Sequence, residues 1–193
     1  MKIQRRPATS LLPLPAVLVT VGDGTQANII TLAWVGVVCS TPPMVGIAVR
    51  PSRHSYGLVA AAREFVVNIP RAAHAEQVDL AGIISGREVD KFAACGFTAQ
   101  PAAKVGAPLI AECPVNLECV VRHQLSLGSH DLFLGEIVAT HYDEEMLDSR
   151  GRPIVGKLDP FAYVEGEYWS LKEKLGAYGF SRKAAKGSPA GQS

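Results

Sequence analysis

The sequence predicts a mainly β fold, a small β-barrel with a few helices inserted between its strands. Runs of β-branched and small apolar residues recur at strand length along the chain, and hairpin-type turn residues separate most of them. A barrel removes exposed sheet edges by closure, and its mouth commonly holds a ligand. We expect one domain over residues 1–182, with the site at the barrel mouth or in a dimer groove. Residues 183–193 lack large apolar side chains and should form a mobile tail.

The composition argues against nucleic acid and anionic membranes as partners. The chain holds 19 Lys and Arg against 18 Asp and Glu, so no overall field attracts polyanions. No stretch reaches the roughly 18 uninterrupted apolar residues of a membrane helix. The basic and apolar start is interrupted by Pro13 and Pro15 and shows no small-residue cleavage pattern. We therefore expect a cytoplasmic protein rather than a secreted one.

The cysteines do not indicate a metal site. Their spacing contains no Cys-x-x-Cys pair and no histidine spacing typical of zinc. Because Cys39 and Cys119 lie in apolar, strand-like sequence, buried reduced thiols are the expectation, and the sequence leaves a disulfide open. The four residues are Cys39, Cys95, Cys113 and Cys119.

The first predicted element is a strand over 16–21 that enters a hairpin. Gly22 and Gly24 suit left-handed turn conformations, and a second strand starts near Asn28. The same glycines imitate the dinucleotide-binding pattern Gly-x-Gly-x-x-Ala. That pattern requires a following helix and an acidic residue about 20 positions on. The chain continues with β-branched residues and has no carboxylate before Glu64, so we interpret these residues as a hairpin.

Residues 28–56 change character three times and look like the centre of the site. Apolar runs over 29–39 and 45–49 predict two buried strands, separated by a turn in which Pro42 and Pro43 cannot join a ladder. A polar cluster follows where a helix would begin. Cations, hydroxyls and the free N–H groups of a helix start together suit a phosphate. The cluster is Arg50, Ser52, Arg53, His54 and Ser55.

The next elements alternate between helix and strand. Ser55 is expected to cap a helix over 56–63, and a strand over 64–69 should end before Pro70. Apolar residues at three- and four-residue steps predict an amphipathic helix over 71–85 that covers a sheet. Residues 96–108, rich in Pro, Gly and Ala, predict a long surface loop.

A second, longer hairpin is predicted over 116–142, with one buried face and one solvent-exposed face. Leu117, Cys119 and Val121 share the apolar face, whereas Asn116 and Glu118 belong to the wet one.

Two histidines and a cluster of aromatic residues are the remaining candidate functional residues. Parity places His123 on the apolar face as a core histidine, while His130 falls in the 128–131 turn, either as a freely solvated side chain or as a functional group. Gly156-Lys157 imitates a phosphate-binding loop, but Leu158 replaces its Ser or Thr, so we interpret a turn. An aromatic cluster either completes a core or interface or stacks on a cofactor; its members are Phe161, Tyr163, Tyr168 and Trp169.

Several short motifs follow one another in order. They are Asn28-x-x-Thr31-x-Ala33-Trp34, Ser40-Thr41-Pro42-Pro43, Arg50-Pro51-Ser52-Arg53-His54-Ser55, Asp90-Lys91-Phe92, Pro108 to Glu112 with Asn116 to Cys119, Gly128 to Glu136, and Asp159 to Tyr163. Over about residues 10–182, this series resembles the flavin reductase-like, FMN-binding split-barrel family. It is most similar to the flavoredoxin branch.

The resemblance implies a Greek-key split barrel that forms a homodimer and binds FMN non-covalently near the subunit interface. Ser52, His54 and Ser55, with backbone N–H groups and Arg50 or Arg53, would hold the phosphate. His130 would stand where nicotinamide or another donor docks, and Lys91 would favour negative charge on the reduced ring. The other positions expected to contact FMN are Asn28, Thr31, Ala33, Trp34, Ser40 and Tyr163.

The implied function is an FMN-binding oxidoreductase. It would pass electrons from NAD(P)H, or from a reduced protein partner, through the flavin to a small-molecule or protein acceptor. The flavin performs the redox chemistry, so no protein nucleophile is required. Two alternatives remain: a flavin-binding or electron-carrier protein without a nicotinamide site, and a β domain without a cofactor.

Overall fold

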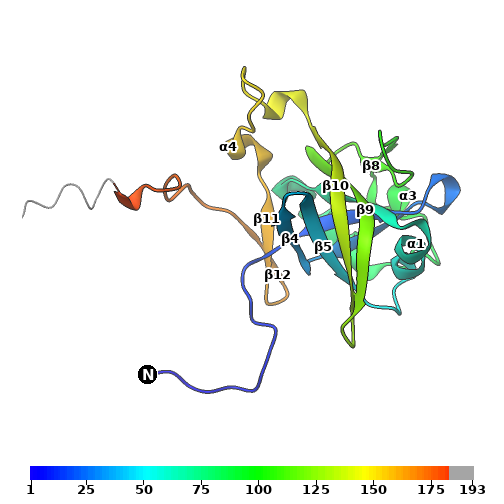
Figure 1. The fold of residues 1–193 in the computed structure, drawn as a ribbon, viewed down its shortest axis with the longest axis horizontal. Helices are drawn as coiled ribbons and strands as arrows, with labels where there is room; N and C mark the ends of the chain where they lie inside the picture. Colours follow the sequence, from blue (N-terminus) through cyan, green and yellow to red (C-terminus); the bar gives the residue numbers. More distant parts are fainter. Residues whose placement is uncertain (183–193) are drawn as a thin grey trace, which may run out of the picture.

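A curled, antiparallel seven-stranded sheet forms the centre of the molecule (Figure 1), in a computed structural model that describes residues 1–182. The predicted tail at 183–193 lies outside the described residues. The sheet order is β3-β2-β6-β9-β10-β5-β4, and two small sheets, β1-β11-β12 and β7-β8, flank it. The strands are β1 (Leu14–Pro15), β2 (Val17–Val21), β3 (Asn28–Leu32), β4 (Val35–Ser40), β5 (Pro43–Val49), β6 (Glu64–Ile69), β7 (Ala99–Gln100), β8 (Leu109–Ile110), β9 (Val115–Ser126), β10 (Asp131–Tyr142), β11 (Phe161–Val164) and β12 (Glu167–Ser170).

Helices are inserted between the strands, as the sequence predicts. The β5-to-β6 connection carries the first helix past β9 and β10, because those strands lie between β5 and β6 in the sheet. This is a Greek-key connection, and the prediction of a mainly β barrel with inserted helices is confirmed. The helices are α1 (His54–Ala62), α2 (Ala75–Ile83), α3 (Lys91–Cys95) and α4 (Val155–Leu158), with short 3₁₀ turns at Gly24–Gln26, Ala72–His74 and Glu144–Met146.

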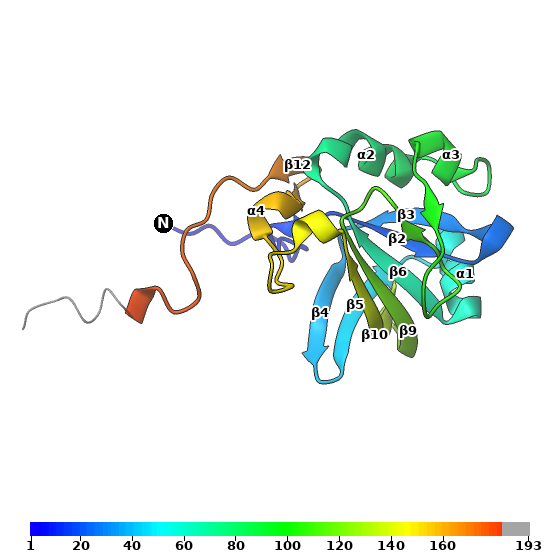
Figure 2. The same cartoon turned by 90° about the horizontal axis from the view of Figure 1, so that it is seen from above.

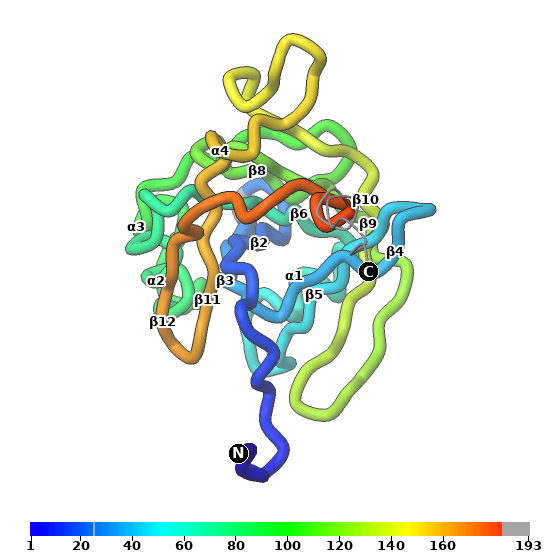
Figure 3. Tube along the Cα trace, turned by 90° about the vertical axis from the view of Figure 1, so that its left-hand side faces the viewer, coloured from blue at the N-terminus to red at the C-terminus, as the bar shows by residue number. Residues whose placement is uncertain are grey.

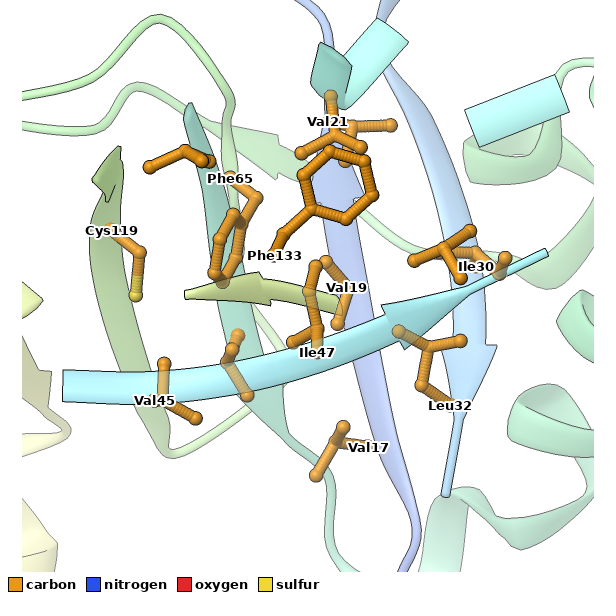
Figure 4. Packing of buried hydrophobic residues seen from close by; sticks show 14 residues of the cluster. Val17, Val19, Val21, Ile30, Leu32, Val45, Ile47, Phe65, Cys119 and Phe133 are labelled. Carbon is orange, nitrogen blue, oxygen red and sulfur yellow. The ribbon is translucent and has the colours of Figure 1, made fainter. Parts of the chain in front are cut away.

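Two apolar clusters share the strands of the sheet. Val19, Phe65 and Phe133 belong to a cluster in which side chains from several strands point toward one another (Figure 4). The second cluster lies under α2 and α3, which cover the opposite side of the sheet from the β4–β5 hairpin (Figure 2). Leu18 belongs to this second cluster. Every residue of β2 is therefore buried, because both faces of that strand are covered.

The two ends of the barrel domain meet in the three-stranded sheet. Leu14 of β1 pairs with Tyr163 of β11. From there, residues 1–13 run away from the barrel (Figure 3), and the chain from β12 to residue 182 also leaves it (Figure 1). The predicted Gly22 turn is confirmed, since Gly22 and Gly24 both have positive φ between β2 and β3.

The apolar run over 29–39 is not a single buried strand. β3 ends at Leu32 and β4 begins at Val35, and the Val35 N–H donates to the Ala33 carbonyl at 3.0 Å in the turn between them. β4 is the edge strand of the sheet, and most of its residues are exposed. Val37 and Val38 are 76% and 54% exposed. The prediction of two buried strands is wrong for β4.

Residues 96–108, which were predicted to form a surface loop, cover one face of the sheet. β7 within this segment pairs with β8, and Val105 and Ala107 are buried against Val66 of β6. This loop covers a face of the sheet that the alternation pattern assigns to solvent.

The wet face predicted for β9 is therefore wrong in its first half. Asn116 and Glu118 are buried, and Glu118 is fully inaccessible. The Glu118 carboxylate accepts the backbone N–H groups of Ala103, Lys104 and Val105 at 2.8, 2.6 and 3.1 Å. A charged residue can be buried here because these donors replace water.

The prediction of a core His123 is also wrong, because a β-bulge changes the parity of β9. Val121 pairs with Gly135 and His123 pairs with Leu134, which leaves Arg122 as an extra residue. The side chains beyond the bulge are turned to the opposite faces, and His123 is exposed.

Two further sequence expectations concern cysteines and membranes. All four cysteines lie in the described part of the chain and none is paired there; Cys95, Cys113 and Cys119 are buried and Cys39 is half-buried. Among the helices that the structure describes, none has the length and apolar character to cross a membrane.

Candidate functional site

A cavity of about 600 Å³ gathers the residues that the sequence singles out. Its wall is built by β3 with the turn after it, the start of α1, the end of α2 and the following loop, and the turns at His130 and Gly166. Ser40 lies elsewhere, exposed at the end of β4. The predicted cofactor-binding residues that line the cavity are Asn28, Thr31, Ala33, Trp34, Arg50, Ser52, His54, Ser55, Lys91, His130 and Tyr163.

The start of α1 forms one end of the cavity. Arg53 is the N-cap in an extended conformation, and within the described residues no side chain caps this helix. Ser55 lies in the first turn instead of at the predicted cap, and its hydroxyl accepts from Asn28 Nδ2 at 2.8 Å. The first-turn N–H groups of a helix lack intrahelical acceptors, so this end can bind an anion.

Positive charge dominates the cavity. Four cationic side chains line it, whereas Asp79 is the one carboxylate in the lining contributed by the described chain. This excess favours a doubly negative group such as a phosphate monoester. The cations are Arg50, Arg53, Arg87 and Lys91.

The edge of β3 supplies backbone groups along the cavity. β3 is the end strand of the seven-stranded sheet, so alternate residues direct N–H and C=O groups away from β2. The Thr31 hydroxyl is already used, because it donates to the Val78 carbonyl of α2 at 2.6 Å. Thr31 thus offers its backbone to a ligand, while its side chain holds α2 in place.

Asn28 is fixed from two sides. It is 4% exposed, and besides its bond to Ser55 it packs directly against Gly86. A Cβ atom on Gly86 would stand 2.1 Å from Asn28 Oδ1. Only glycine permits this approach of the α2–α3 loop to β3.

Lys91 is buried at the start of α3. Asp90 caps this helix by accepting the N–H groups of Phe92 and Ala93, and Phe92 anchors it in the second cluster. Lys91 Nζ donates to the Ala81 carbonyl at 2.6 Å. Burial lowers the pKa of Lys91, and the charge of Arg53 lowers it further against an opposing effect of Cys95. In this motif Asp90 caps the helix, Lys91 lines the cavity and Phe92 packs in the core.

Trp34 and His130 form a stacked pair in the cavity wall. Their ring centroids are 6.0 Å apart at an interplanar angle of 14°, and Ser129 Oγ lies 2.9 Å from His130 Nδ1. His130 is half-buried instead of freely presented. Burial, followed by the charge of Arg50, lowers the pKa of His130. Both effects favour the neutral imidazole.

Tyr163 and Tyr168 close another side of the cavity. Their centroids are 5.7 Å apart, and the Tyr168 hydroxyl donates to Asp79 Oδ1 at 3.2 Å. Burial, with the nearby Asp79 carboxylate, raises the pKa of Tyr168 to about 12. Trp169 is 56% exposed and donates to Glu167, so it does not belong to this ring cluster.

Sequence reasoning missed the segment that lines the cavity directly beside β3. The end of α2 and the loop after it contribute residues 82–87, and Asp79 and Tyr168 join them. The pattern over 71–85 indicates a helix that covers a sheet, and a covering helix gives no sign that its last turn borders a ligand site. Gly82, near the end of α2, and Gly86, in the loop after it, could have indicated a close approach to a ligand. Glycines at helix ends and in loops are too common to indicate a ligand site.

Comparison with known proteins places the chain among flavoproteins. Residues 9–172 match the family model described as flavin reductase like domain. An uncharacterized protein of Pyrococcus abyssi is 34% identical over 166 residues, which cover 86% of this chain and 94% of the relative. Flavoredoxin of Desulfovibrio vulgaris (Miyazaki F) superposes with a TM-score of 0.87 at 34% identity, covering 95% of this chain and all of that one. Flavoredoxin from Methanosarcina acetivorans gives 0.88 at 30% identity, covering 96% and 99%.

Two more distant similarities carry names that state a ligand or a donor. An NADPH-flavin oxidoreductase of Streptomyces viridifaciens is 29% identical over 149 residues, covering 76% of this chain and 71% of the relative. An FMN-binding protein from Thermus thermophilus superposes with a TM-score of 0.77 at 26% identity, covering 92% and 97%.

Proposed function

The chain belongs to the flavin reductase-like family, and from this membership we propose that it is an FMN-binding oxidoreductase. Electrons would pass from a reduced donor through the flavin to an acceptor. One observation supports the proposal most strongly: the cation-rich start of α1 and the open edge of β3 line the same cavity. These two features match the two polar parts of FMN, its phosphate and the edge of its ring.

The cavity fits FMN in size and chemistry. Its volume of about 600 Å³ lies within the roughly 300–1,000 Å³ typical of small-molecule sites. The α1 start, with Ser52, His54 and Ser55, would hold the phosphate, and Arg50 and Arg53 would add charge-assisted hydrogen bonds.

The opposite end of the cavity would hold the ring. Backbone groups from Ile30 to Ala33 would bind its polar edge, and Trp34 and Tyr163 offer aromatic surfaces of low polarity. FMN, when bound, would supply the redox chemistry. The protein's contribution is position and charge. Lys91, whose Nζ is held by the Ala81 carbonyl, would place its amino group on the ring side of the cavity.

We propose NAD(P)H as the donor and His130 as the residue that positions it. A similar protein named as an NADPH-flavin oxidoreductase supports this choice. The neutral imidazole of His130, stacked on Trp34, presents a flat polar surface that suits a nicotinamide ring.

The second candidate function is an electron carrier that a reduced protein, instead of NAD(P)H, supplies with electrons. The likeness to two flavoredoxins favours it.

A homodimer is part of the proposal. Val37 and Val38 on the edge strand β4 expose apolar surface, and such an edge is normally covered or paired. A second copy would cover it.

Anaerobic spectroscopy decides between the two donors. The purified full-length protein, loaded with FMN, should show the visible bands of oxidised flavin, and stoichiometric NADPH or NADH should bleach them. Bleaching by dithionite but by neither nucleotide would contradict the nicotinamide donor and leave the electron carrier. Failure of the protein to retain or bind FMN at all would contradict the proposed function itself.

His130→Ala should separate donor binding from flavin binding. Loss of the ring that faces the donor should raise the KM for NAD(P)H about tenfold, equivalent to about 1.4 kcal/mol, while FMN affinity stays within about twofold. His123→Ala is the matched control, because His123 is exposed and outside the cavity lining. Equal KM values for the two variants and the parent protein would remove His130 from the donor site.

A further inference from the structure

A buried carboxylate lies directly after His130. Asp131 is the first residue of β10 and is 5% exposed. Alternate residues of a strand share a face, so Asp131 points to the same side of the sheet as Phe133, which is fully buried. A carboxylate in such a place is costly unless hydrogen-bond donors replace its water. The donors that hold Asp131 are therefore part of how this turn is built.

Two side chains from different elements donate to this carboxylate. Gln124 Nε2 donates to Asp131 Oδ2 at 2.9 Å, and the Tyr56 hydroxyl donates to the same oxygen at 2.8 Å. Both bonds lower the pKa of Asp131, Gln124 more than Tyr56, and so favour the ionised form. Gln124 belongs to β9, which neighbours β10 in the sheet, whereas Tyr56 belongs to the first turn of α1. The Tyr56 bond therefore joins the sheet to the helix.

The Tyr56 bond connects the two ends of the cavity that the proposed function uses. Tyr56 directly follows Ser55 at the α1 start, where the flavin phosphate would bind. Asp131 directly follows His130, the proposed donor-side residue. Neither Tyr56 nor Asp131 lines the cavity, so both act from behind its wall. The Tyr56 ring also packs edge-on against Phe133, with centroids 5.6 Å apart, and this contact does not need the hydroxyl.

The stack of His130 on Trp34 depends on where the 128–131 turn is held. The Trp34 carbonyl accepts the Ala48 N–H of β5 at 3.0 Å, which fixes Trp34 to the sheet. His130 lies in a turn whose preceding residues 127–129 are exposed, and its carbonyl accepts the Leu127 N–H at 3.0 Å. Asp131 is the buried residue next to this exposed turn, so its side-chain bonds hold the base of the turn in place.

We propose that Tyr56 and Asp131 are positioning residues, whose hydrogen bond holds the His130 turn at a fixed place relative to the α1 start. The inference rests on the proposed function, which puts the flavin phosphate at α1 and the donor beside His130. The bond aligns the donor side with the flavin that the helix holds. Neither residue touches flavin or donor, and neither transfers a proton or an electron.

Nuclear magnetic resonance of the flavin-free full-length chain tests the positioning without any turnover. The Trp34 indole displaces the resonances of an imidazole stacked on it, and His130→Ala identifies these resonances by their loss. Tyr56→Phe removes the hydroxyl but keeps the aromatic ring, and it should move the His130 resonances toward those of the exposed His123. Tyr142→Phe is the matched control and should leave them in place, because Tyr142 is 37% exposed at the other end of β10 and does not line the cavity.

Steady-state kinetics of the FMN-loaded protein test the consequence for the donor. Tyr56→Phe should raise the KM for NAD(P)H about threefold, while kcat and FMN affinity stay within about twofold. In the His130→Ala background the same substitution should change this KM by less than about 1.5-fold, because no imidazole is left to position. A merely structural loss would act equally in both backgrounds and would appear as a lower melting temperature.

The outcomes distinguish this inference from the proposed function. Unchanged His130 resonances in Tyr56→Phe would overturn the inference and leave the proposed function intact. An equal rise in KM in both backgrounds would also overturn it. Failure of the parent chain to bind FMN would overturn the proposed function. The resonances of the flavin-free chain would even then confirm or overturn the placement of His130 by Tyr56 and Asp131.

Discussion

Gly86→Ala should reduce FMN affinity by at least tenfold, or about 1.4 kcal/mol. The new methyl group would stand 2.1 Å from Asn28 Oδ1 and 2.6 Å from its Cγ. The Asn28 side chain is short and buried and cannot simply swing aside, so the loop and β3 must separate or Asn28 must release Ser55. Either change moves the groups that we propose to hold the flavin. Calorimetric titration with FMN measures the loss.

Gly57→Ala is the matched control for this substitution. A Cβ on Gly57, in the middle of α1, meets nothing within 4 Å, and alanine should stabilise the helix by about 0.5–1 kcal/mol. The double variant Asn28→Ala with Gly86→Ala removes the clash. It should recover the melting temperature of the parent but not its FMN affinity. Full FMN affinity in Gly86→Ala alone would show that the contact between Gly86 and Asn28 is not needed by the site.

Glu118→Leu should destabilise the fold by about 3 kcal/mol, because one buried N–H group and two part-buried ones lose their acceptor, at about 1–3 kcal/mol for a buried donor. Those donors belong to Ala103, Lys104 and Val105, and His141 Nε2 also loses its carboxylate partner. Chemical denaturation measures the effect. Glu118→Gln keeps an acceptor oxygen and should recover part of the loss.

Glu136→Leu is the control, because Glu136 on the neighbouring strand pairs with Arg122 at the surface, where an ion pair contributes about 0–1 kcal/mol. Equal destabilisation by Glu118→Leu and Glu136→Leu would contradict the role given to the buried carboxylate.

The same carboxylate predicts an acid-dependent part of the stability. Burial raises the pKa of Glu118, but the N–H groups of Ala103 and Lys104 and the His141 side chain outweigh it and hold the pKa below its ordinary 4.5. A group with a depressed folded pKa stabilises the fold above its unfolded pKa, and this stability is lost as the pH falls through the folded value. The difference between the parent and Glu118→Leu should therefore shrink below about pH 4.5.

Local patterns predicted the barrel well where both faces of a strand, or one face consistently, are covered. β2 and β5 follow their apolar patterns. β4 does not, since Val37 and Val38 are as apolar as core residues and the sequence cannot say that β4 lies at an edge. His123 is misplaced by one extra residue, Arg122, in its own strand β9, and strict alternation cannot reveal such a bulge.

The site was predicted where its residues also form a recognisable order along the chain. The stretch from Asn28 to Ser55 and the isolated positions Lys91, His130 and Tyr163 converge on one cavity. The part of the lining from residues 82–87 could not be predicted, because its contribution depends on how α2 lies against β3 through Thr31 and Val78. Ser40 was predicted to contact FMN because it belongs to the Ser40-Thr41-Pro42-Pro43 motif, but it does not line the cavity.

The pairing of β1 with β11 has a consequence for the order of events at the ribosome. Leu14 leaves the exit tunnel early, yet its partner Tyr163 is made near the end of the described chain. The same late segment brings Tyr163 and Tyr168, which close one side of the cavity. Strands β2 to β10 can assemble before that, because their ladders do not involve it. The side of the cavity that Tyr163 and Tyr168 form is therefore completed only after the strands of the barrel have been synthesised.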